Sequence, residues 1–335
     1  MILGFQWSFC SAQHTWTQKS PDGQLQLRLD FAEGTPSYSV QLQDEVFLEN
    51  AFLGLKASIG DFSSGLQWVS TDTSTIRNSY GMTNAKVSHV DYVAKERINS
   101  YINKNGDTLE IIFRVSNRDV AYCYRIATKA PSGKIKILEE VSSFNLPNEA
   151  TTFISPQATP MTGWEKTKPS YEEAYTHNGA LETSSAYGVG YTFPALFKIG
   201  EKGWVLISET GVDSRYPGSR LSEGTKEGVY TITFPQEGEN NGMGATYAAQ
   251  TLPAKTPWRT ITLGTDLKPI VESTIAFDLV EPLYEPSCEY KMGRATWSWI
   301  VWQDASINYE DQLKFIDLAA SLNFEYVLID AWWDK

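Results

Sequence analysis

The side chains best suited to chemistry lie in two short stretches, PSYEEAY at 169–175 and YVLIDAWWDK at 326–335. In the first, Glu172 and Glu173 are adjacent acids beside two tyrosines, between a proline and an Asn-Gly turn, which favours a loop that reaches outward. A hard cation such as calcium takes several oxygen ligands, and a neighbouring domain can supply one of them. The alternative is that this acidic pair forms an ordinary solvated surface.

Asp330 follows the apolar run 326–329, so a buried strand would carry its carboxylate to the edge of a sheet. There it could hold ligand hydroxyls through charge-assisted hydrogen bonds, or it could act as a helix cap or as half of a loop salt bridge. Trp332 and Trp333 come directly afterwards. One of them could form a stacking platform for a sugar ring, and at least one is equally suited to packing under a neighbouring domain.

The elements around the first stretch are predicted to be strands. Between residues 24 and 277, β-branched and aromatic runs alternate with turns rich in Pro, Gly, Asn and Asp. The predicted strands are 24–31, 38–42, 96–102, 109–115, 120–126, 134–144, 187–199, 203–209, 229–234 and 258–264. So many short strands at this spacing predict a mainly β fold, a large antiparallel β-sandwich without internal repeats.

The second stretch ends a segment with a different pattern. Residues 295–302 predict a buried strand, 306–324 an amphipathic helix capped by Ser306 or Asn308, and 326–333 a second buried strand. The apolar helix positions are Leu313, Ile316, Ala320 and Phe324, and Asn323 is the expected stop. A strand, a helix and a strand joined by short loops form a βαβ unit with parallel pairing. Because two parallel strands alone cannot bury both faces, we expect this unit to open a larger α/β domain that this chain does not contain.

The composition supports a folded protein and excludes some partners. The chain has 335 residues, 41% of them hydrophobic and 13% aromatic, which is enough for a sizeable core in one large domain or two. The aromatic side chains suit a sandwich core and also suit stacking on sugar rings. A net charge of −12 without a basic stripe argues against nucleic acid as a partner. Three scattered cysteines form neither a disulfide framework nor a zinc motif.

The N-terminal segment, 1–18, begins with the apolar run MILGFQWSFCSAQ and leaves three interpretations open. It resembles the end of a partial secretory signal peptide, it could carry a lipid on Cys10, or it could form an ordinary first strand. No later stretch approaches the roughly 20 apolar residues of a transmembrane helix. We therefore expect an exported protein, periplasmic or secreted, with no transmembrane segment.

Several stretches, taken in order from about Lys19 to the end of the chain, resemble glycoside hydrolase family 97. They are KSPDGQLQLRLDF with 36–58, PSYEEAY, FPALFKIGEKGWVLISETGVDSRYPGSRL at 193–221, 257–282, GRATWSWIVWQD at 293–304, and YVLIDAWWDK. The resemblance implies an N-terminal β-sandwich over 19–278, a linker over 279–294 and the start of an incomplete (β/α)8 catalytic barrel over 295–335.

The resemblance implies cleavage of α-linked glucosides or α-galactosides, with a calcium ion in the active site. The family's general acid and its base or nucleophile lie on later barrel strands, so no catalytic residue is expected within this chain, and inversion or retention stays open. The predicted function is the N-terminal portion of an exported glycoside hydrolase whose calcium-assisted, two-carboxylate hydrolysis is completed by residues beyond this chain. The alternative is a non-catalytic carbohydrate-binding or interaction β-sandwich module.

The resemblance also implies roles for single residues. A sandwich glutamate of the family reaches the barrel mouth near the calcium, and Glu172 matches it best, with Glu173 as the second choice. In a barrel, chemistry gathers at the C-terminal ends of the strands, where Asp330 would lie. Trp297 and Trp299 are expected mainly in the core. The predicted substrate contacts are Glu172, Asp330, Trp332, Trp302 and Asp304, and the predicted metal ligands are Glu172 and Glu173.

Overall fold

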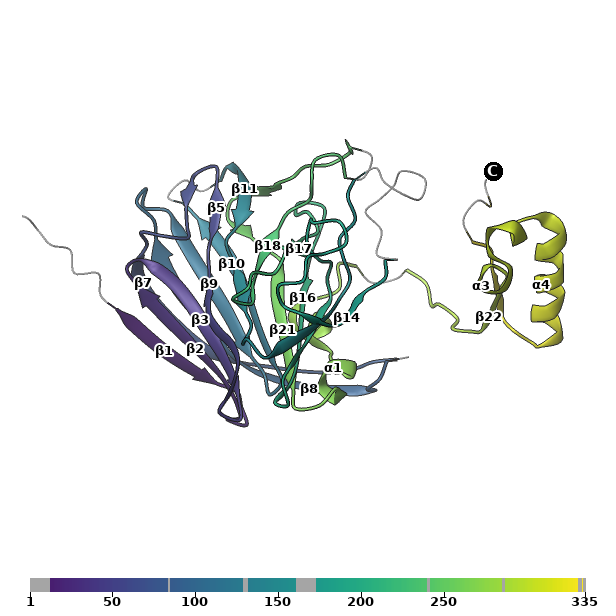
Figure 1. The fold of residues 1–335 in the computed structure, drawn as a ribbon, viewed down its shortest axis with the longest axis horizontal. Helices are drawn as coiled ribbons and strands as arrows, with labels where there is room; N and C mark the ends of the chain where they lie inside the picture. Colours follow the sequence, from purple (N-terminus) through teal and green to yellow (C-terminus); the bar gives the residue numbers. More distant parts are fainter. Residues whose placement is uncertain are drawn as a thin grey trace, which may run out of the picture. The chain divides into compact units, whose positions relative to one another are not determined.

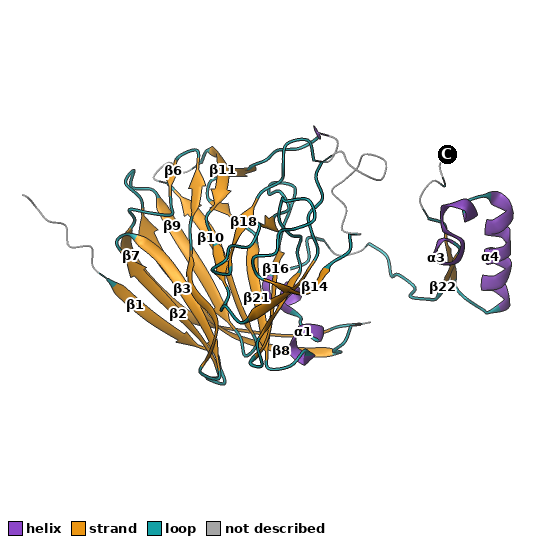
Figure 2. Cartoon of the chain, in the orientation of Figure 1, coloured by secondary structure: helices purple, strands orange, loops and turns teal. Residues whose placement is uncertain are grey.

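The computed structural model describes residues 13–83, 85–128, 132–160, 173–239, 242–284, 287–330 and 333. The chain divides into two compact units, Met1–Glu281 and Pro282–Lys335, which we call unit 1 and unit 2. Unit 1 consists almost entirely of strands, and unit 2 combines two short strands with helices (Figures 1 and 2).

One layer of unit 1 is a ten-stranded sheet in which every pairing is antiparallel. Its order is β14 (Thr176–Ala180), β13 (Ala150–Ile154), β15 (Ala195–Ile199), β16 (Gly203–Thr210), β21 (Trp258–Gly264), β10 (Asp119–Ala127), β9 (Thr108–Val115), β8 (His89–Ile102) and β7 (Gln67–Gly81), with β20 (Ala254–Lys255) also on β10. β21 lies in the middle and is buried along its whole length.

The second layer is built from three small antiparallel sheets. They are β1 (His14–Lys19), β2 (Leu25–Ala32), β3 (Thr35–Leu42) and β4 (Glu45–Phe52); then β19 (Ala248–Thr251), β11 (Lys134–Glu140), β5 (Leu55–Ala57) and β6 (Gly60–Asp61); then β12 (Ser143–Asn145), β18 (Val229–Thr233) and β17 (Arg220–Leu221). Figure 1 shows β2 and β3 lying over β9 and β10 of the large sheet. The predicted antiparallel β-sandwich is confirmed.

Alternation along the strands explains how the two layers hold together. On β2, Leu25, Leu27, Leu29 and Phe31 are buried, whereas the residues between them are partly or fully exposed. Burying a side chain of this size stabilises the fold by about 1.5–3 kcal/mol. Tyr38 on β3 reaches across to the large sheet, and its ring centroid lies 5.6 Å from that of Tyr122 on β10.

One charged cluster joins the two layers inside this core. Arg259 on β21 is 1% exposed. It donates from Nε and Nη2 to the two carboxylate oxygens of Glu140 on β11, at 2.9 and 2.6 Å. Its Nη1 donates to Glu209 on β16 and to the Ser219 hydroxyl. Burial lowers the pKa of the Arg259 guanidinium, but the charge and hydrogen bonds of Glu140 and the charge of Glu209 outweigh burial, so its pKa lies well above the ordinary value.

Two predicted strands of unit 1 are shorter than expected. The segment 134–144 divides into β11 and β12, because β11 pairs with β5 and β19 whereas β12 pairs with β18 in another sheet. The segment 187–199 is a strand only from Ala195 onward. Before that, Gly190 has a φ of +95°, and a Cβ there would lie 2.1 Å from the Leu221 carbonyl oxygen, so the backbone approaches β17 too closely for a regular strand.

Unit 1 ends with two short helices, α1 (Lys268–Val271) and α2 (Ile275–Leu279). Asp278 on α2 accepts hydrogen bonds from the Tyr80 hydroxyl at 2.7 Å and the Thr274 hydroxyl at 2.8 Å, and burial raises its pKa. Among the described residues, no helix is both long enough and apolar enough to cross a membrane.

Unit 2 contains β22 (Ala295–Trp297), α3 (Trp299–Trp302), a 3-10 helix (Gln303–Ser306), α4 (Tyr309–Ser321) and β23 (Tyr326–Leu328). β22 and β23 pair in parallel, as the βαβ pattern predicts. Asn308 is the helix cap, because its side chain accepts from the Asp311 N–H at 3.0 Å. The helix stops before Asn323, which has a φ of +52°.

The prediction of one continuous strand over 295–302 is wrong. β22 ends at Trp297, because the Ser298 carbonyl accepts the N–H groups of Val301 and Trp302 and closes a helical turn. The buried Ser298 hydroxyl is bonded to Ser306 at 2.9 Å and to Gln312 Nε2 at 2.7 Å. These contacts come from residues distant in sequence, so the alternating Trp pattern alone could not reveal the turn.

The buried residues of α4 are not the apolar positions named from the sequence. Phe315 and Ala319 are buried together with the polar Gln312, whereas Leu313 and Ile316 are 41% and 44% exposed. The helix carries apolar residues on more than one face, so periodicity alone cannot select the face that meets β22. The run 326–329 is likewise not buried, since Tyr326, Leu328 and Ile329 are 45–46% exposed.

The buried charge cluster leads to a stability prediction. Arg259→Met should lower the free energy of unfolding by about 3–5 kcal/mol, because it leaves the buried carboxylate of Glu140 without its partner. Arg215→Met removes an exposed pair with Asp213 and should change the stability little. Urea unfolding of both variants at neutral pH measures the difference. Equal effects of the two substitutions would show that the cluster does not stabilise the sandwich.

A buried acid leads to a prediction about pH. Asp119 is 2% exposed. Burial raises its pKa to about 6, although hydrogen bonds from Thr262 and Ser116 partly oppose this shift. Since the folded pKa lies above the ordinary value of about 3.9, the folded state binds the proton more tightly, and this stabilisation of about 3 kcal/mol is lost as pH rises from about 4 through 6.

Asp119→Asn should therefore flatten the decline in unfolding free energy between about pH 4 and pH 7. Asp213→Asn is the matched control, because hydrogen bonds from Arg215 lower the pKa of Asp213 and leave it ionised throughout this range. Urea unfolding across the range measures both slopes. A slope in Asp119→Asn identical to that of the parent chain would contradict the assignment.

Candidate functional site

In unit 1, Glu173 lies just before β14, the edge strand of the large sheet. It is half-buried, and its Oε2 accepts a hydrogen bond from the Tyr187 hydroxyl at 2.8 Å. Tyr175 follows with 59% of its surface exposed. The predicted neighbour Glu172 lies outside the described residues, so the acidic pair as a metal site stays a prediction.

In unit 2, the candidate residues gather where β22 and β23 end. Parallel strands bring their carboxyl ends to the same edge of a sheet, and ligands commonly bind there in α/β folds. Trp297 is the last residue of β22, and Asp330 comes two residues after the end of β23. The Trp297 Nε1–H donates to Asp330 Oδ2 at 2.7 Å, which fixes the orientation of this half-buried carboxylate.

A second indole and a second carboxylate repeat this arrangement. The Trp299 Nε1–H donates to Asp304 Oδ1 at 2.7 Å. The rings of Trp297 and Trp299 are stacked, with centroids 5.8 Å apart and planes inclined by 19°. The stacked pair therefore holds Asp330 through one ring and Asp304 through the other. Sequence periodicity placed Trp297 and Trp299 mainly in the core, and the structure shows them half-buried as donors to these carboxylates.

Trp302 differs from its neighbours, because its ring turns to α4. It meets the Phe315 ring edge-on at a centroid distance of 5.1 Å, and Lys314 Nζ lies 5.5 Å from its centroid. Its surface is still 45% exposed. Trp332, the predicted stacking platform, lies outside the described residues. The roles of Trp302 and Trp332 in substrate binding stay predictions.

The chemistry open to this edge is binding and orientation. Two carboxylates held by indole N–H groups can accept charge-assisted hydrogen bonds from hydroxyl groups, as sugar-binding sites require. Among the described residues, no group of three His, Cys, Asp or Glu side chains could hold a metal ion. The calcium prediction therefore gains no ligand set from the described residues.

Sequence reasoning missed the role of Glu209. This acid belongs to the buried Arg259 cluster. The available signal was a single arginine within the apolar run 258–264, because a charge in a fully buried strand needs an opposite charge beside it.

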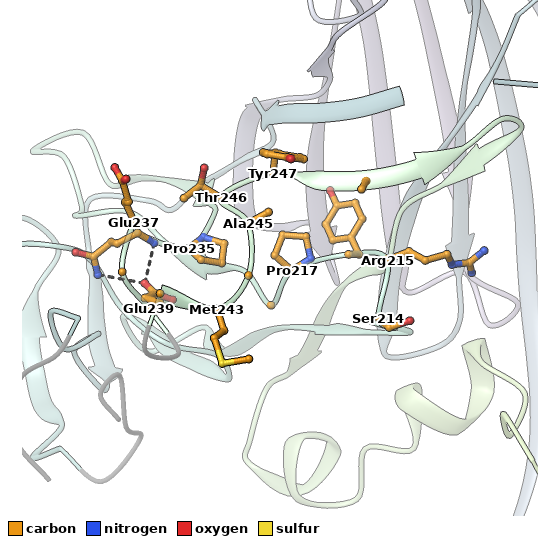
Figure 3. Close-up of a pocket in the computed structure, with 17 residues that line it drawn as sticks. Ser214, Arg215, Pro217, Pro235, Glu237, Glu239, Met243, Ala245, Thr246 and Tyr247 are labelled. Atoms are coloured by element: carbon orange, nitrogen blue, oxygen red, sulfur yellow. Dashed lines mark hydrogen bonds between the residues drawn. The ribbon is translucent and has the colours of Figure 1, made fainter. Parts of the chain in front are cut away.

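Sequence reasoning also missed a cavity of about 790 Å³ in unit 1. It opens between the loop 214–218, which follows β16, and residues 235–239 and 242–247, which precede β19 (Figure 3). Its residues are scattered through turns with no motif of their own. Only the folded loops bring them together.

Comparisons with known proteins agree with the resemblance. The family described as Glycosyl-hydrolase 97 N-terminal matches residues 19–282. A "Probable retaining alpha-galactosidase" of Streptomyces bingchenggensis (strain BCW-1) is 26% identical over 338 residues, which cover 95% of this chain and 47% of that protein.

Two solved structures are similar over almost the whole chain. The crystal structure of a beta-arabinopyranosidase is 48% identical with a TM-score of 0.91, over 96% of this chain and 51% of that one. A glycoside hydrolase family 97 enzyme from Pseudoalteromonas sp. strain K8, solved with panose, shares the fold at 21% identity and a TM-score of 0.77, over 95% of this chain and 47% of that one. The chain thus spans about half the length of these relatives.

The indole–carboxylate pairs lead to a prediction about unit 2. Trp297→Phe keeps an aromatic ring but removes the N–H that Asp330 accepts, and should lower the local stability by about 1 kcal/mol. Hydrogen exchange of the α4 and β22 amides measures this change, with Trp333→Phe, a ring 73% exposed, as the control. Unchanged protection in Trp297→Phe would mean that the hydrogen bond does not hold the edge together.

Proposed function

Because this chain belongs to the glycosyl-hydrolase 97 N-terminal family, we propose that it is the N-terminal portion of a glycoside hydrolase acting on pyranosides with the galacto configuration. The observation that carries the proposal is the 48% identity, over 96% of the chain, to a beta-arabinopyranosidase. The similarity to a probable retaining alpha-galactosidase points to the same sugar configuration.

The two activities fit one sugar-binding pocket. β-L-Arabinopyranose has the ring configuration of α-D-galactopyranose and lacks only the hydroxymethyl group on C5. A site that accepts one sugar therefore needs to change only around that group to accept the other. α-Glucosides, also implied by the resemblance, differ in the orientation of the C4 hydroxyl. A site whose polar groups hydrogen-bond the C4 hydroxyl in the galacto orientation leaves those groups unpaired when a glucoside binds.

In this proposal unit 2 begins a (β/α)8 barrel. One support is that β22 and β23 pair in parallel, with α4 in the connection between them. The other is that α4 and β23 carry exposed apolar side chains. Leu313 and Ile316 on α4 and Leu328 on β23 would be covered by later helices and strands of the barrel. Asp330 and Asp304 would then lie at the catalytic face and bind hydroxyls of the substrate, oriented by Trp297 and Trp299.

The bond-breaking residues of this proposal lie outside the chain. Hydrolysis of a glycoside needs a pair of carboxyl groups, one acting as acid and the other as base or nucleophile, on opposite sides of the scissile bond. Calcium, if the whole protein uses it, would take Glu172 or Glu173 as one ligand among others from the barrel. Export to the periplasm or the medium is part of the same proposal and rests on the apolar start of the sequence.

The test compares three p-nitrophenyl substrates on the protein with its complete barrel. We expect kcat/KM for the β-L-arabinopyranoside or the α-D-galactopyranoside to exceed that for the α-D-glucopyranoside by about 100-fold or more, because of the C4 hydroxyl. The 335-residue chain alone should show no turnover. Faster hydrolysis of the glucoside would overturn the configuration, and no hydrolysis of any substrate by the complete protein would overturn the enzyme assignment.

A substitution at Asp330 tests the substrate-binding edge. Asp330→Asn should lower kcat/KM on the preferred substrate by about 10- to 100-fold, since one charge-assisted hydrogen bond to the sugar is weakened. Glu310→Gln, an exposed acid in the first turn of α4, is the control and should leave kcat/KM unchanged. Equal activity of the two variants would exclude Asp330 from substrate binding.

A further inference from the structure

The cavity between residues 214–218 on one side and 235–239 and 242–247 on the other has two walls that buried groups hold in place. On one wall, Tyr216 is 4% exposed and its hydroxyl donates to Glu140 at 3.1 Å. The Arg215 carbonyl beside it accepts from Gln250 at 3.3 Å. This wall is therefore fastened to the same Glu140 that binds Arg259 in the core.

The other wall is fastened by a second buried arginine. Arg220 is 7% exposed, and its Nη1 donates to the Phe234 carbonyl at 2.8 Å and to Glu239 at 3.3 Å. Glu239 also accepts from the Gln236 N–H at 2.8 Å. With both walls fixed from within, the cavity is preformed, and its 790 Å³ falls within the range of about 300–1,000 Å³ typical of small-ligand sites.

The lining combines apolar faces with polar groups that have no hydrogen-bond partner among the described residues. Pro217, Pro235 and Met243 present carbon surface, and Tyr247 adds a half-buried ring held by Lys136, whose Nζ lies 4.2 Å from the ring centroid. Within the described part of the chain, neither the Glu237 carboxylate nor the Tyr247 hydroxyl has a hydrogen-bond partner. Both are therefore available to a ligand (Figure 3).

The charge of the lining selects against anions. Glu237 and Glu239 line the cavity, and its one arginine, Arg215, is already paired with Asp213 through its Nε and Nη2. Hydroxyl groups can donate to Glu237 and accept from Tyr247, while the C–H faces of a pyranose ring pack on proline and tyrosine rings. The lining therefore suits a ligand that is neutral, rich in hydroxyls and has apolar faces.

The cavity also adjoins the chain that leads to Glu173. Gln236 Nε2 donates to the Ala158 carbonyl at 3.4 Å. A Cβ at Gly238 would lie 3.6 Å from Pro160, the last described residue before Glu173. A glycan in the cavity would therefore lie close to Ala158 and Pro160.

We propose that this cavity is a binding site for a short neutral oligosaccharide. The proposal rests on the proposed function only for the choice of glycans to test, because the chemistry of the lining stands by itself. The 335-residue chain is titrated with melibiose, raffinose and maltotriose by calorimetry and by saturation-transfer NMR. We expect saturable binding of at least one glycan with a Kd of about 1 mM or below.

Three variants locate that binding. Tyr247→Ala should weaken it about tenfold by removing the stacking ring, and Glu237→Gln should weaken it severalfold by removing the charged acceptor. Phe277→Ala, an aromatic ring 62% exposed on α2 and outside the cavity, should leave the affinity unchanged. Circular dichroism verifies that each variant is folded.

Two results would overturn the proposal. One is no saturable binding of any of the three glycans. The other is binding that persists in Tyr247→Ala and Glu237→Gln but disappears in Trp302→Ala, which would assign the glycan to unit 2. Both results are independent of hydrolysis by the complete protein, so failure here and failure of the proposed enzyme function are distinguished.

Discussion

The buried pairing of Arg259 with Glu140 is the interaction on which most of unit 1 depends. A charge taken out of water is costly, and only close, fully hydrogen-bonded partners offset that cost. The large sheet contributes Arg259 and Glu209, and a small sheet of the opposite layer contributes Glu140, so the cluster specifies how the two layers face each other. The same carboxylate of Glu140 also fastens Tyr216, which connects the core charge to one wall of the cavity.

The strands could be predicted wherever local sequence decides the structure. Alternating burial, as on β2, fixes which face of a strand meets the core, and the sandwich follows from many such strands. Prediction failed where contacts with residues distant in sequence determine where a strand begins or ends. Ser298 ends β22 through bonds to Ser306 and Gln312, and the close approach of Gly190 to Leu221 prevents a regular strand. No local pattern contains these contacts.

The candidate site shows the same division. The position of Asp330 follows from a strand that ends in a carboxylate, and the parallel βαβ pattern brings it to the end of β22. Its partner could not be predicted, because Trp297 was indistinguishable from a core residue in sequence. The role of Glu209 in the buried cluster could not be predicted either. An acid near a turn looks exposed unless the arginine that neutralises it, 50 positions along the chain, is considered as well.

The two units use charge in different ways, and this difference bears on function. In unit 1, the carboxylates of Glu140 and Glu209 neutralise Arg259 inside the fold. These ion pairs hold the two layers of the sandwich together. In unit 2, Asp304 and Asp330 each accept a hydrogen bond from a neutral indole N–H, which orients the carboxylate. An oriented carboxylate is a strong hydrogen-bond acceptor. The edge of β22 and β23 is thus suited to binding hydroxyl groups. The core cluster of the sandwich instead stabilises the two layers and the cavity wall that contains Tyr216.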